Sequence, residues 1–369
     1  MGPSRQSRLM PVVALASCFL TLAILEFALR LWDHQLLTTR NFVLDELALL
    51  HSQYPVQFDA SLGWTPKANA IGTAEMWGTT VGITILPDGT RSNGSQRAIA
   101  NAHPVIVAVG DSFTFGDEVS DSETWPAWLE RKLGSPVING GVFGYGIDQI
   151  YLRARALVDK YHPDILIVSL IDDDIVRAEF SERHHAEKPY FDVVDGQLSL
   201  RNTPVPPPRP HHGGMWLRKS LGHSLLVHYL MRLLAPAFWF DASSDSIHRH
   251  GHGPEVACLL MRDLTRITRE RRLRTIVLAQ DELSGPSPLT CLDTDVVETV
   301  EMAPDLKEQQ AKDPLGFRQK FFRVTHMSPL GNEFVAEKLY QRIGPAAQPQ
   351  THHTAEDTTD KGGIRPIAS

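Results

Sequence analysis

The sequence predicts an α/β fold in which a parallel sheet is covered by helices on both faces. Short apolar runs at residues 105–109 and 165–170 each match a strand that is buried on both of its sides. Segments with helical periodicity, residues 122–132 and 147–161, alternate with these runs. Alternation of this kind is typical of parallel sheets, because the connection between two parallel strands usually contains a helix.

The other elements are predicted by local signals. Ser328 is a good N-cap and Pro329 suits the first helical position, so we expect the last helix to run from there to residue 343. Residues 202–210 contain too many prolines to be anything but a loop. The remaining expected elements are an edge strand at 80–86, strands at 136–138 and 275–279, and helices at about 216–236 and 255–272.

Composition restricts the class of protein. The 369 residues are 42% hydrophobic and 21% charged, which is typical of a folded chain that can bury a core without disulfide bonds. The formal net charge of -7 argues against a protein that mainly binds nucleic acid, because such domains carry a basic surplus. We therefore expect no nucleic-acid partner.

An uncharged apolar stretch, residues 9–25, lies near the start of the chain. Two arginines precede it, Glu26 and Arg30 close it, and apolar side chains continue beyond it. A membrane-spanning helix needs about 20 mostly apolar residues, and positive charge before the span favours export of the chain beyond it. We expect residues 1–32 to be an uncleaved single-pass anchor, with the rest on the periplasmic or extracytoplasmic side. The alternatives are a cleaved signal peptide, a lipoprotein signal at Cys18 and a buried helix.

The rest of the chain divides into three parts. We expect a connector with edge elements at residues 33–100 and one α/β domain at residues 101–345. The domain carries an irregular insertion at about 180–255, which we expect to shape the binding pocket. The polar tail at residues 346–369 is expected to be disordered.

Cysteine and histidine residues show no specific pattern for a metal. Three cysteines cannot form a disulfide framework or a metal cluster. Export would allow Cys258 and Cys291 to pair, and two buried free thiols are the alternative. Histidines gather in two places without the spacing of metal ligands, so we expect polar loops there, no metal and no cofactor. These histidines are His211, His212, His248, His250 and His252.

Residues that could carry chemistry lie directly after the predicted strands. Ser112 lies in VGDSFTFG after the first strand, Gly144 lies in NGGVFGYG after the second, and three aspartates at 172–174 come after the third. The carboxyl ends of parallel strands meet at the sheet edge where open α/β folds bind ligands. His326 lies on the loop before the last helix. Together these residues could provide a nucleophile, a backbone donor for an oxyanion and a general base.

These blocks resemble the SGNH, or GDSL, hydrolase superfamily, and the strings GDSFTFG and GYGIDQ resemble its membrane-anchored bacterial members. The resemblance covers about residues 103–178 and 321–343. It implies a three-layer α/β/α fold of flavodoxin-like type and esterase, lipase, thioesterase or carbohydrate acetylesterase activity. It also implies that Ser112 is the nucleophile, that His326 is the base, and that the amides of Ser112 and Gly144 form the oxyanion hole.

Two positions depart from the family pattern. Asp173 stands where the family has an Asn that donates to the oxyanion, and a carboxylate there would repel the developing charge. Arg323 stands where the family has the Asp that orients the histidine, and a cation cannot stabilise the imidazolium. We therefore expect Asp173, or Asp172, to take over the role of orienting His326. A serine–histidine dyad is the alternative.

The sequence as a whole favours a membrane-anchored, exported serine esterase that forms an acyl-serine intermediate. We expect its substrate to be an acylated small molecule or glycan of the cell envelope. The alternatives are an O-acetyltransferase acting on an exported glycan, and a degenerate member that binds a glycan or a partner without catalysis. Asp174 and Arg177 are candidate supporting residues, since Arg177 could bind a substrate carboxylate or sugar, or pair with Asp174.

Overall fold

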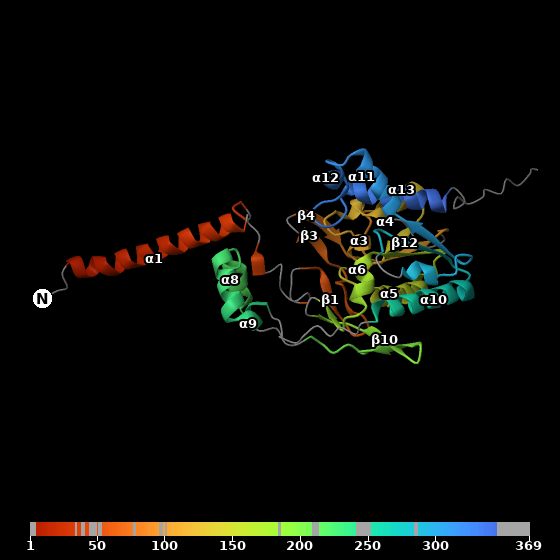
Figure 1. The fold of residues 1–369 in the computed structure, drawn as a ribbon, viewed down its shortest axis with the longest axis horizontal. Helices are drawn as coiled ribbons and strands as arrows, with labels where there is room; N and C mark the ends of the chain where they lie inside the picture. Colours follow the sequence, from red (N-terminus) through yellow and green to blue (C-terminus); the bar gives the residue numbers. More distant parts are fainter. Residues whose placement is uncertain are drawn as a thin grey trace, which may run out of the picture.

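The fold of the chain is given by a computed structural model (Figure 1). The structure describes residues 5–33, 35–37, 41–43, 50, 54–76, 79–95, 99, 102–183, 186–208, 214–240, 252–283 and 287–344. The expected tail at 346–369 lies outside the described residues, as do four of the clustered histidines, His211, His212, His248 and His250.

Five parallel strands form the central sheet, in the order β13-β12-β7-β5-β6. Numbered along the chain and read from β6 to β13, the order is 2-1-3-4-5, as in flavodoxin-like folds. The direction of winding changes between β5 and β7, and ligands bind beside the carboxyl ends of the strands at such a point. The five strands are β5 (Ile106–Val109), β6 (Val137–Asn139), β7 (Ile165–Leu170), β12 (Arg274–Ala279) and β13 (Val297–Glu301).

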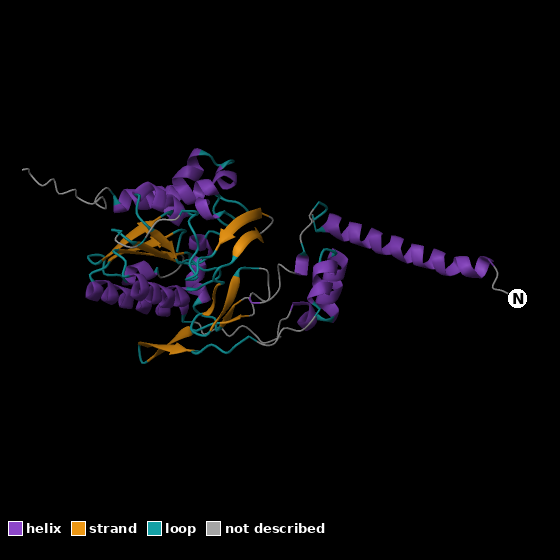
Figure 2. Ribbon diagram, turned by 180° about the vertical axis from the view of Figure 1, so that it is seen from behind, coloured by secondary structure: helices purple, strands orange, loops and turns teal. Residues whose placement is uncertain are grey.

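Two helical layers cover the sheet, which confirms the predicted three-layer α/β/α fold (Figures 1 and 2). Side chains of alternate strand positions enter two separate cores. Val107 and Val168 belong to one core and Ile106 and Ile167 to the other. The first core contains residues of α5 (Ile147–Tyr161) and α10 (Gly253–Arg271), and the second contains residues of α4 (Trp125–Leu133) and α13 (Pro329–Ile343).

Local signals in the sequence account for the ends of the helices. The side chain of Ser328 accepts a hydrogen bond from Gly331 N and caps α13 as expected. The helix expected at 216–236 is interrupted, because Ser224 caps a new helix through Val227 N. It is replaced by α7 (Met215–Leu221), α8 (Leu225–Leu234) and α9 (Pro236–Phe240).

Within the described residues, eight further strands form four antiparallel hairpins outside the central sheet. The strand expected at 80–86 is β4, which pairs with β3 rather than with the central sheet. A bridge between Arg91 and Asn139 connects this region to β6. The hairpin strands are β1 (Val56–Asp59), β2 (Gly63–Pro66), β3 (Ile71–Met76), β4 (Thr79–Thr84), β8 (Glu182–Arg183), β9 (Ala186–Glu187), β10 (Tyr190–Val194) and β11 (Gln197–Arg201).

The N-terminal helix α1 (Arg5–Trp32) extends away from the α/β domain (Figure 1). Its segment Val12–Trp32, 21 residues, is long and apolar enough to cross a membrane and is not buried in the protein. Length and composition alone fit a membrane span or a signal sequence. The remaining short helices are α3 (Ser112–Phe115), η2 (Asp121–Glu123), α6 (Asp172–Arg177), η3 (Pro288–Cys291), α11 (Ala303–Lys312) and α12 (Phe317–Phe321).

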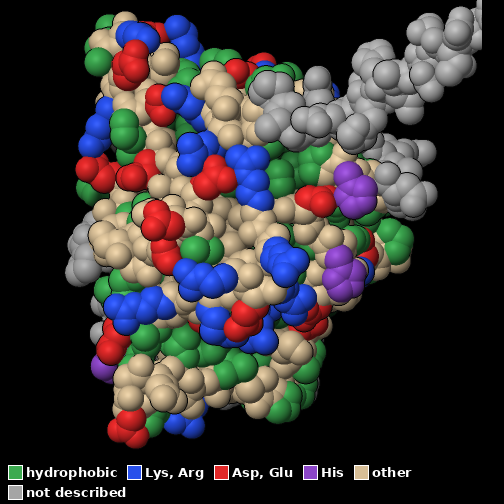
Figure 3. All heavy atoms as spheres, turned by 90° about the vertical axis from the view of Figure 1, so that its right-hand side faces the viewer, with side chains coloured by type: hydrophobic (Ala, Val, Ile, Leu, Met, Phe, Trp, Pro, Cys, Tyr) green, Lys and Arg blue, Asp and Glu red, His purple; other side chains and the backbone are tan. Residues whose placement is uncertain are grey.

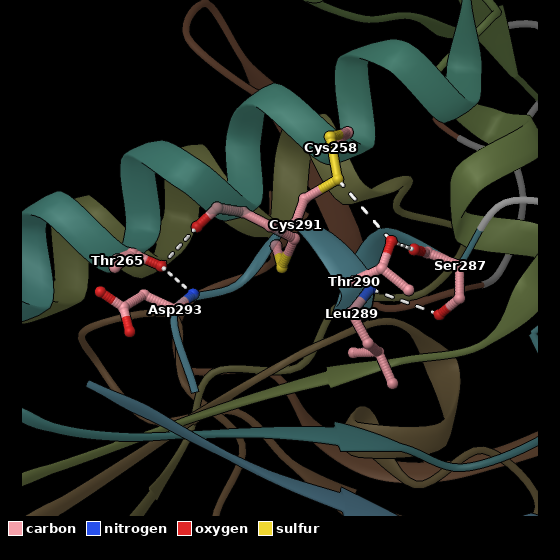
Figure 4. Close-up of a disulfide and its surroundings, with 8 residues drawn as sticks. Cys258, Thr265, Ser287, Leu289, Thr290, Cys291 and Asp293 are labelled. Carbon is pink, nitrogen blue, oxygen red and sulfur yellow. Dashed lines mark hydrogen bonds between the residues drawn. A yellow bond between two sulfur atoms is a disulfide. The ribbon is translucent and has the colours of Figure 1, made fainter. Parts of the chain in front are cut away.

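Cys258 and Cys291 form a disulfide bond (Figure 4). Cys258 lies on α10 and Cys291 ends η3, so the bond ties the loop after β12 to a helix of the domain. Of the two arrangements that the sequence allowed, the structure therefore shows the disulfide. Cys18 is a free cysteine, exposed on α1.

Candidate active site

Ser112 begins α3 directly after the turn that ends β5. Asp111 caps this short helix, since its Oδ1 accepts a hydrogen bond from Phe113 N at 2.9 Å. The turn is tight enough that a Cβ atom on Gly110 would overlap the side chain of Thr114. Ser112 is therefore held at the carboxyl edge of the sheet, with 3% of its surface exposed.

His326 lies between α12 and α13 and faces Ser112. Its Nε2 is 2.9 Å from Ser112 Oγ, although the two residues are 214 positions apart in the sequence. The bridge between Phe322 and Met327 closes the loop, and Arg323 N donates to His326 O at 2.8 Å. The imidazole can accept the hydroxyl proton of Ser112 in this position, as a general base must.

Glu118 contacts the other nitrogen of the imidazole. His326 Nδ1 lies 3.1 Å from Glu118 Oε1, and the carboxylate is buried. Thr325 and Val324 hold it from the histidine loop: Thr325 Oγ1 donates to Oε1 at 2.7 Å, and Val324 N donates to Oε2 at 2.8 Å. The contacts therefore form a continuous serine–histidine–glutamate chain, which is the arrangement of a catalytic triad.

Glu118 stands where the sequence suggested Asp173 or Asp172. The side chain of Asp173 is 69% exposed and pairs with Arg177 Nη2 at 3.3 Å, and Asp172 N donates to Asp281 Oδ1. Both aspartates begin α6, and the nitrogens of His326 contact Ser112 and Glu118 instead. The expectation that Asp173 orients His326 is therefore not met, because a carboxylate on the loop after Ser112 fills that position.

The pKa values of the pair are shifted in opposite directions. Burial alone would raise the pKa of Glu118, but hydrogen bonds from His326 and Thr325 outweigh it and lower the pKa to about 2. Burial alone would lower the pKa of His326, but the hydrogen bond to Glu118 and the charges of Asp117 and Asp111 raise it. Glu118 is therefore ionised at neutral pH and favours the imidazolium that forms when His326 takes a proton.

Asp117 is a second buried carboxyl group beside the imidazole. Its Oδ1 accepts a hydrogen bond from Tyr54, while its buried Oδ2 has no hydrogen-bond partner among the described residues. Oδ2 lies 3.9 Å from His326 Nε2. Burial raises the pKa of Asp117 to about 6, although the positive charge of His326 opposes this shift. The site therefore contains a carboxyl group that can change its charge near neutral pH.

Arg91 holds the loop that carries these two acids. Its buried guanidinium donates from Nη1 to the carbonyl oxygens of Phe115 and Gly116 at 2.8 and 2.6 Å, and from Nη2 to Val119 O at 2.7 Å. Nε also pairs with Asp121 at 3.1 Å. Gly116 has φ +93°, and a Cβ atom there would clash with a neighbouring side chain, so the turn requires glycine.

Arg177 joins the serine turn to the acids of α6. Its Nη1 donates to Asp111 Oδ2 at 2.9 Å, to Asp174 Oδ1 at 2.8 Å and to Tyr145 O at 3.1 Å. Burial alone would lower the pKa of Arg177, but the neighbouring carboxylates raise it. Of the roles expected for Arg177, the structure shows the salt bridge with Asp174, which supports the turn around Ser112.

The glycine-rich loop after β6 is attached to β2. Trp64 Nε1 donates to Phe143 O at 2.9 Å, and Tyr145 Oη donates to Trp64 O at 2.6 Å. Between these two anchors lies Gly144, whose φ of +70° suits glycine. The assignment of the Gly144 and Ser112 amides as oxyanion donors remains a prediction.

Glu118, Asp117 and Arg91 are residues of the candidate site that the sequence did not reveal. Glu118 comes only six positions after Ser112, so a carboxylate on the nucleophile loop was the signal that could have identified it. Neither Asp117 nor Arg91 belongs to a motif, and their roles depend on burial that only the folded chain reveals. Among the described residues, no group of three His, Cys, Asp or Glu side chains is placed to hold a metal ion.

Comparisons with known proteins add little to this geometry. No protein-family model matches the chain, and no curated protein matches it. Among solved structures, a protein described as lipolytic and of the G-D-S-L family, from Desulfitobacterium hafniense DCB-2, is 12% identical over 65% of this chain and 99% of its own, with a TM-score of 0.33. TesA is 13% identical over 65% of this chain and 98% of its own, also with a TM-score of 0.33. Scores this low carry no argument about function.

Proposed function

We propose that this chain is an SGNH-type serine esterase that hydrolyses carboxylic esters through an acyl-serine intermediate. The observation that carries the proposal is the hydrogen-bonded chain from Ser112 through His326 to Glu118. It supplies a nucleophile, a base and an orienting acid within contact distance of each other. The motifs GDSFTFG and GYGIDQ, which resemble those of SGNH hydrolases, support the same assignment.

The first half of the reaction acylates the serine. Ser112 Oγ attacks the ester carbonyl carbon while His326 Nε2 takes the hydroxyl proton, and the carbonyl electrons move to the oxygen. The amides of Ser112 and Gly144 would donate to this oxyanion. Collapse of the tetrahedral intermediate breaks the bond to the alcohol, which leaves with the proton that His326 returns.

The second half releases the acid. His326 takes a proton from water, the hydroxide attacks the acyl-serine, and the second tetrahedral intermediate expels Ser112 with its proton restored. Glu118 stabilises the imidazolium in both halves, since it remains ionised. In the transferase alternative, a sugar hydroxyl would replace the water in this second half.

Glu118 also bears on the degenerate, non-catalytic alternative. Two departures favour that alternative: Asp173 stands where the family has its oxyanion Asn, and Arg323 stands where the family has its acid. In the structure the acid comes from Glu118, and the backbone of Arg323 only closes the histidine loop. The missing family aspartate is therefore no reason to expect an inactive site.

The location of the enzyme is part of the proposal. Helix α1 would anchor it in a membrane, with the α/β domain on the exported side and an acylated envelope molecule as its substrate. The disulfide between Cys258 and Cys291 supports export, because such bonds persist in oxidising compartments.

The test compares the two acids that could orient His326. Glu118→Gln should lower kcat for a p-nitrophenyl ester about 10³-fold or more, because the amide favours the wrong imidazole tautomer. Asp173→Ala is the control and should keep kcat within about threefold, since its side chain is exposed. Steady-state hydrolysis rates decide between them. A fully active Glu118→Gln protein would contradict the proposed triad, and a reversed pattern would restore Asp173.

A further inference from the structure

The helix α8 exposes one apolar face. Tyr229, Leu230, Leu233 and Leu234 are 41%, 50%, 79% and 69% exposed. They form two pairs at i, i+4 spacing, 229 with 233 and 230 with 234, and so share one face of the helix. We call these four residues the α8 apolar face. Large apolar side chains that gather in this way on a protein surface mark a site of interaction.

The opposite face of α8 is already covered. Val227 and Met231 pack against a small core that contains Trp239 and Val43, and His228 contacts the Trp239 indole at 3.4 Å. Since α7, α8 and α9 form this core among themselves and with residue 43, the α8 apolar face is directed away from it. It is an outer surface that the described part of the chain leaves exposed.

The start of α8 is fixed to the end of α1. Glu26 accepts hydrogen bonds from Leu225 N at 3.0 Å, Leu226 N at 2.8 Å and Ser224 Oγ at 2.9 Å. Arg30 pairs with Glu26 at 2.6 Å and donates to His223 O at 2.6 Å. Glu26 is the first charged residue after the uncharged stretch at 9–25 and lies in the last third of the segment Val12–Trp32, so these bonds hold the start of α8 near the end of the span.

The direction of α8 suits the surface of a bilayer. Figures 1 and 2 show α8 running across the end of α1 rather than along it. If α1 crosses the membrane, α8 then lies close to the plane of the interface. Trp32 at the end of α1 and Trp216 on α7 are both strongly exposed, and tryptophan favours the headgroup region.

Charge supports lipid as the occupant. The segments 215–221 and 225–234 contain no Asp or Glu, and Lys219 and Arg232 are exposed basic residues on them. An apolar helix face beside basic side chains is the pattern of helices that lie in a membrane interface. Figure 3 shows the end of the molecule opposite α1, where acidic and basic side chains are interspersed.

We propose that α8 lies in the interface of the bilayer that α1 crosses, with the α8 apolar face among the lipid acyl chains. The inference rests on the proposed anchoring by α1. It makes α8 a second membrane contact, which would fix how the α/β domain sits above the bilayer instead of leaving the domain on a single tether.

The test uses the full chain in nanodiscs of phosphatidylglycerol and phosphatidylcholine, with Cys18→Ser and one nitroxide label per protein. Labels are placed through Leu233→Cys on α8, Leu20→Cys on α1 and Leu315→Cys, a 94% exposed leucine between α11 and α12. The collision rates of each label with oxygen and with a nickel chelate are compared. We expect the oxygen-to-nickel ratio at 233 to be several-fold higher than at 315 and to approach the ratio at 20.

Each other outcome has a separate meaning. An oxygen-to-nickel ratio at position 233 that equals the ratio at position 315 would overturn the proposed position of α8. If the label at position 20 still has a ratio typical of lipid, the anchoring by α1 is unaffected. Low collision rates with both reagents at 233 would show that protein covers the face, which also overturns the proposal. A water-exposed label at 20 would contradict the anchoring on which the inference rests, while the proposed esterase chemistry would stand.

Discussion

His326 lies between two carboxyl groups that differ in their environment. Glu118 accepts several hydrogen bonds, and its pKa is lowered to about 2, so it is always ionised at neutral pH. Asp117 has one oxygen without a hydrogen-bond partner among the described residues, and burial raises its pKa to about 6. The two environments give the acids different pKa values. In the proposed triad the ionised Glu118 orients His326, and the charge of Asp117 beside the imidazole changes with pH near 6.

The raised pKa of His326 should appear in the pH dependence of catalysis. The base must be neutral, so kcat/KM should fall as the pH decreases through a value above 6.5, the ordinary histidine pKa. Glu118→Gln removes the hydrogen bond that raises this pKa, so its acid limb should move to lower pH. The pH profiles of ester hydrolysis by the two proteins give the position of each acid limb. An acid limb at or below pH 6.5 in the unmodified enzyme would contradict the assigned environment of His326, which includes Glu118, Asp117 and Asp111.

Asp117→Asn should stabilise the protein at high pH. The folded-state pKa of Asp117 lies above its unfolded value, so the charged group destabilises the fold most above pH 6, and this penalty vanishes below about pH 4. We expect a gain of about 2–3 kcal/mol at pH 8 and none at pH 4, from urea unfolding. At pH 8, where His326 is neutral, kcat should fall, because the charge of Asp117 favours the imidazolium that forms during the reaction. Equal stabilisation at both pH values would contradict the role of its charge.

At the scale of elements, the loop between α3 and η2 positions the acid. Arg91 binds its carbonyl groups at residues 115, 116 and 119, and Glu118 lies in it with φ +67°, a strained conformation for this residue type. The loop can keep this conformation because the buried guanidinium fixes the backbone on both sides of Glu118. Arg91 is therefore a positioning residue.

Arg91→Lys should damage both stability and catalysis. An ammonium group cannot reach the carbonyl groups that the planar guanidinium binds, so we expect a loss of about 3 kcal/mol or more in the free energy of unfolding. Because Arg91 acts through Glu118, kcat should also decrease and the acid limb should move to lower pH. Arg266→Lys, on the surface of α10, is the matched control and should change neither. If Arg91→Lys lowers the free energy of unfolding but leaves the pH profile unchanged, Arg91 supports the fold and does not position Glu118.

Elements with a strong periodic signal could be predicted from the sequence, and weaker ones could not. The buried strand at 165–170 and the helices at 147–161 and 329–343 have the predicted bounds. Strand β13 was missed because its sequence, VETVE, lies at the edge of the sheet and is only partly buried. The prediction of one helix at 216–236 was wrong. The segment has a continuous apolar pattern, but Ser224 begins a new helix there as an N-cap.

At the scale of the whole molecule, the site combines segments that the sequence keeps far apart. Ser112 and His326 could be paired in advance because the sequence blocks that contain them resemble those of SGNH hydrolases. Glu118 could not, since its approach depends on the turn at Gly116 and on the hydrogen bonds from residues 324 and 325. Long-range positions of this kind are set by packing rather than by any local pattern.

The measurement that tests the central claim most directly is labelling by an alkyl fluorophosphonate, followed by intact mass. We expect one adduct per full-length chain, lost in Ser112→Ala and strongly slowed in Glu118→Gln, because only an activated serine displaces fluoride. Asp173→Ala should label at the normal rate, because its side chain is exposed. A folded protein that gains no adduct, or that labels equally well as Ser112→Ala, would contradict the claim that Ser112, His326 and Glu118 form a working hydrolase site.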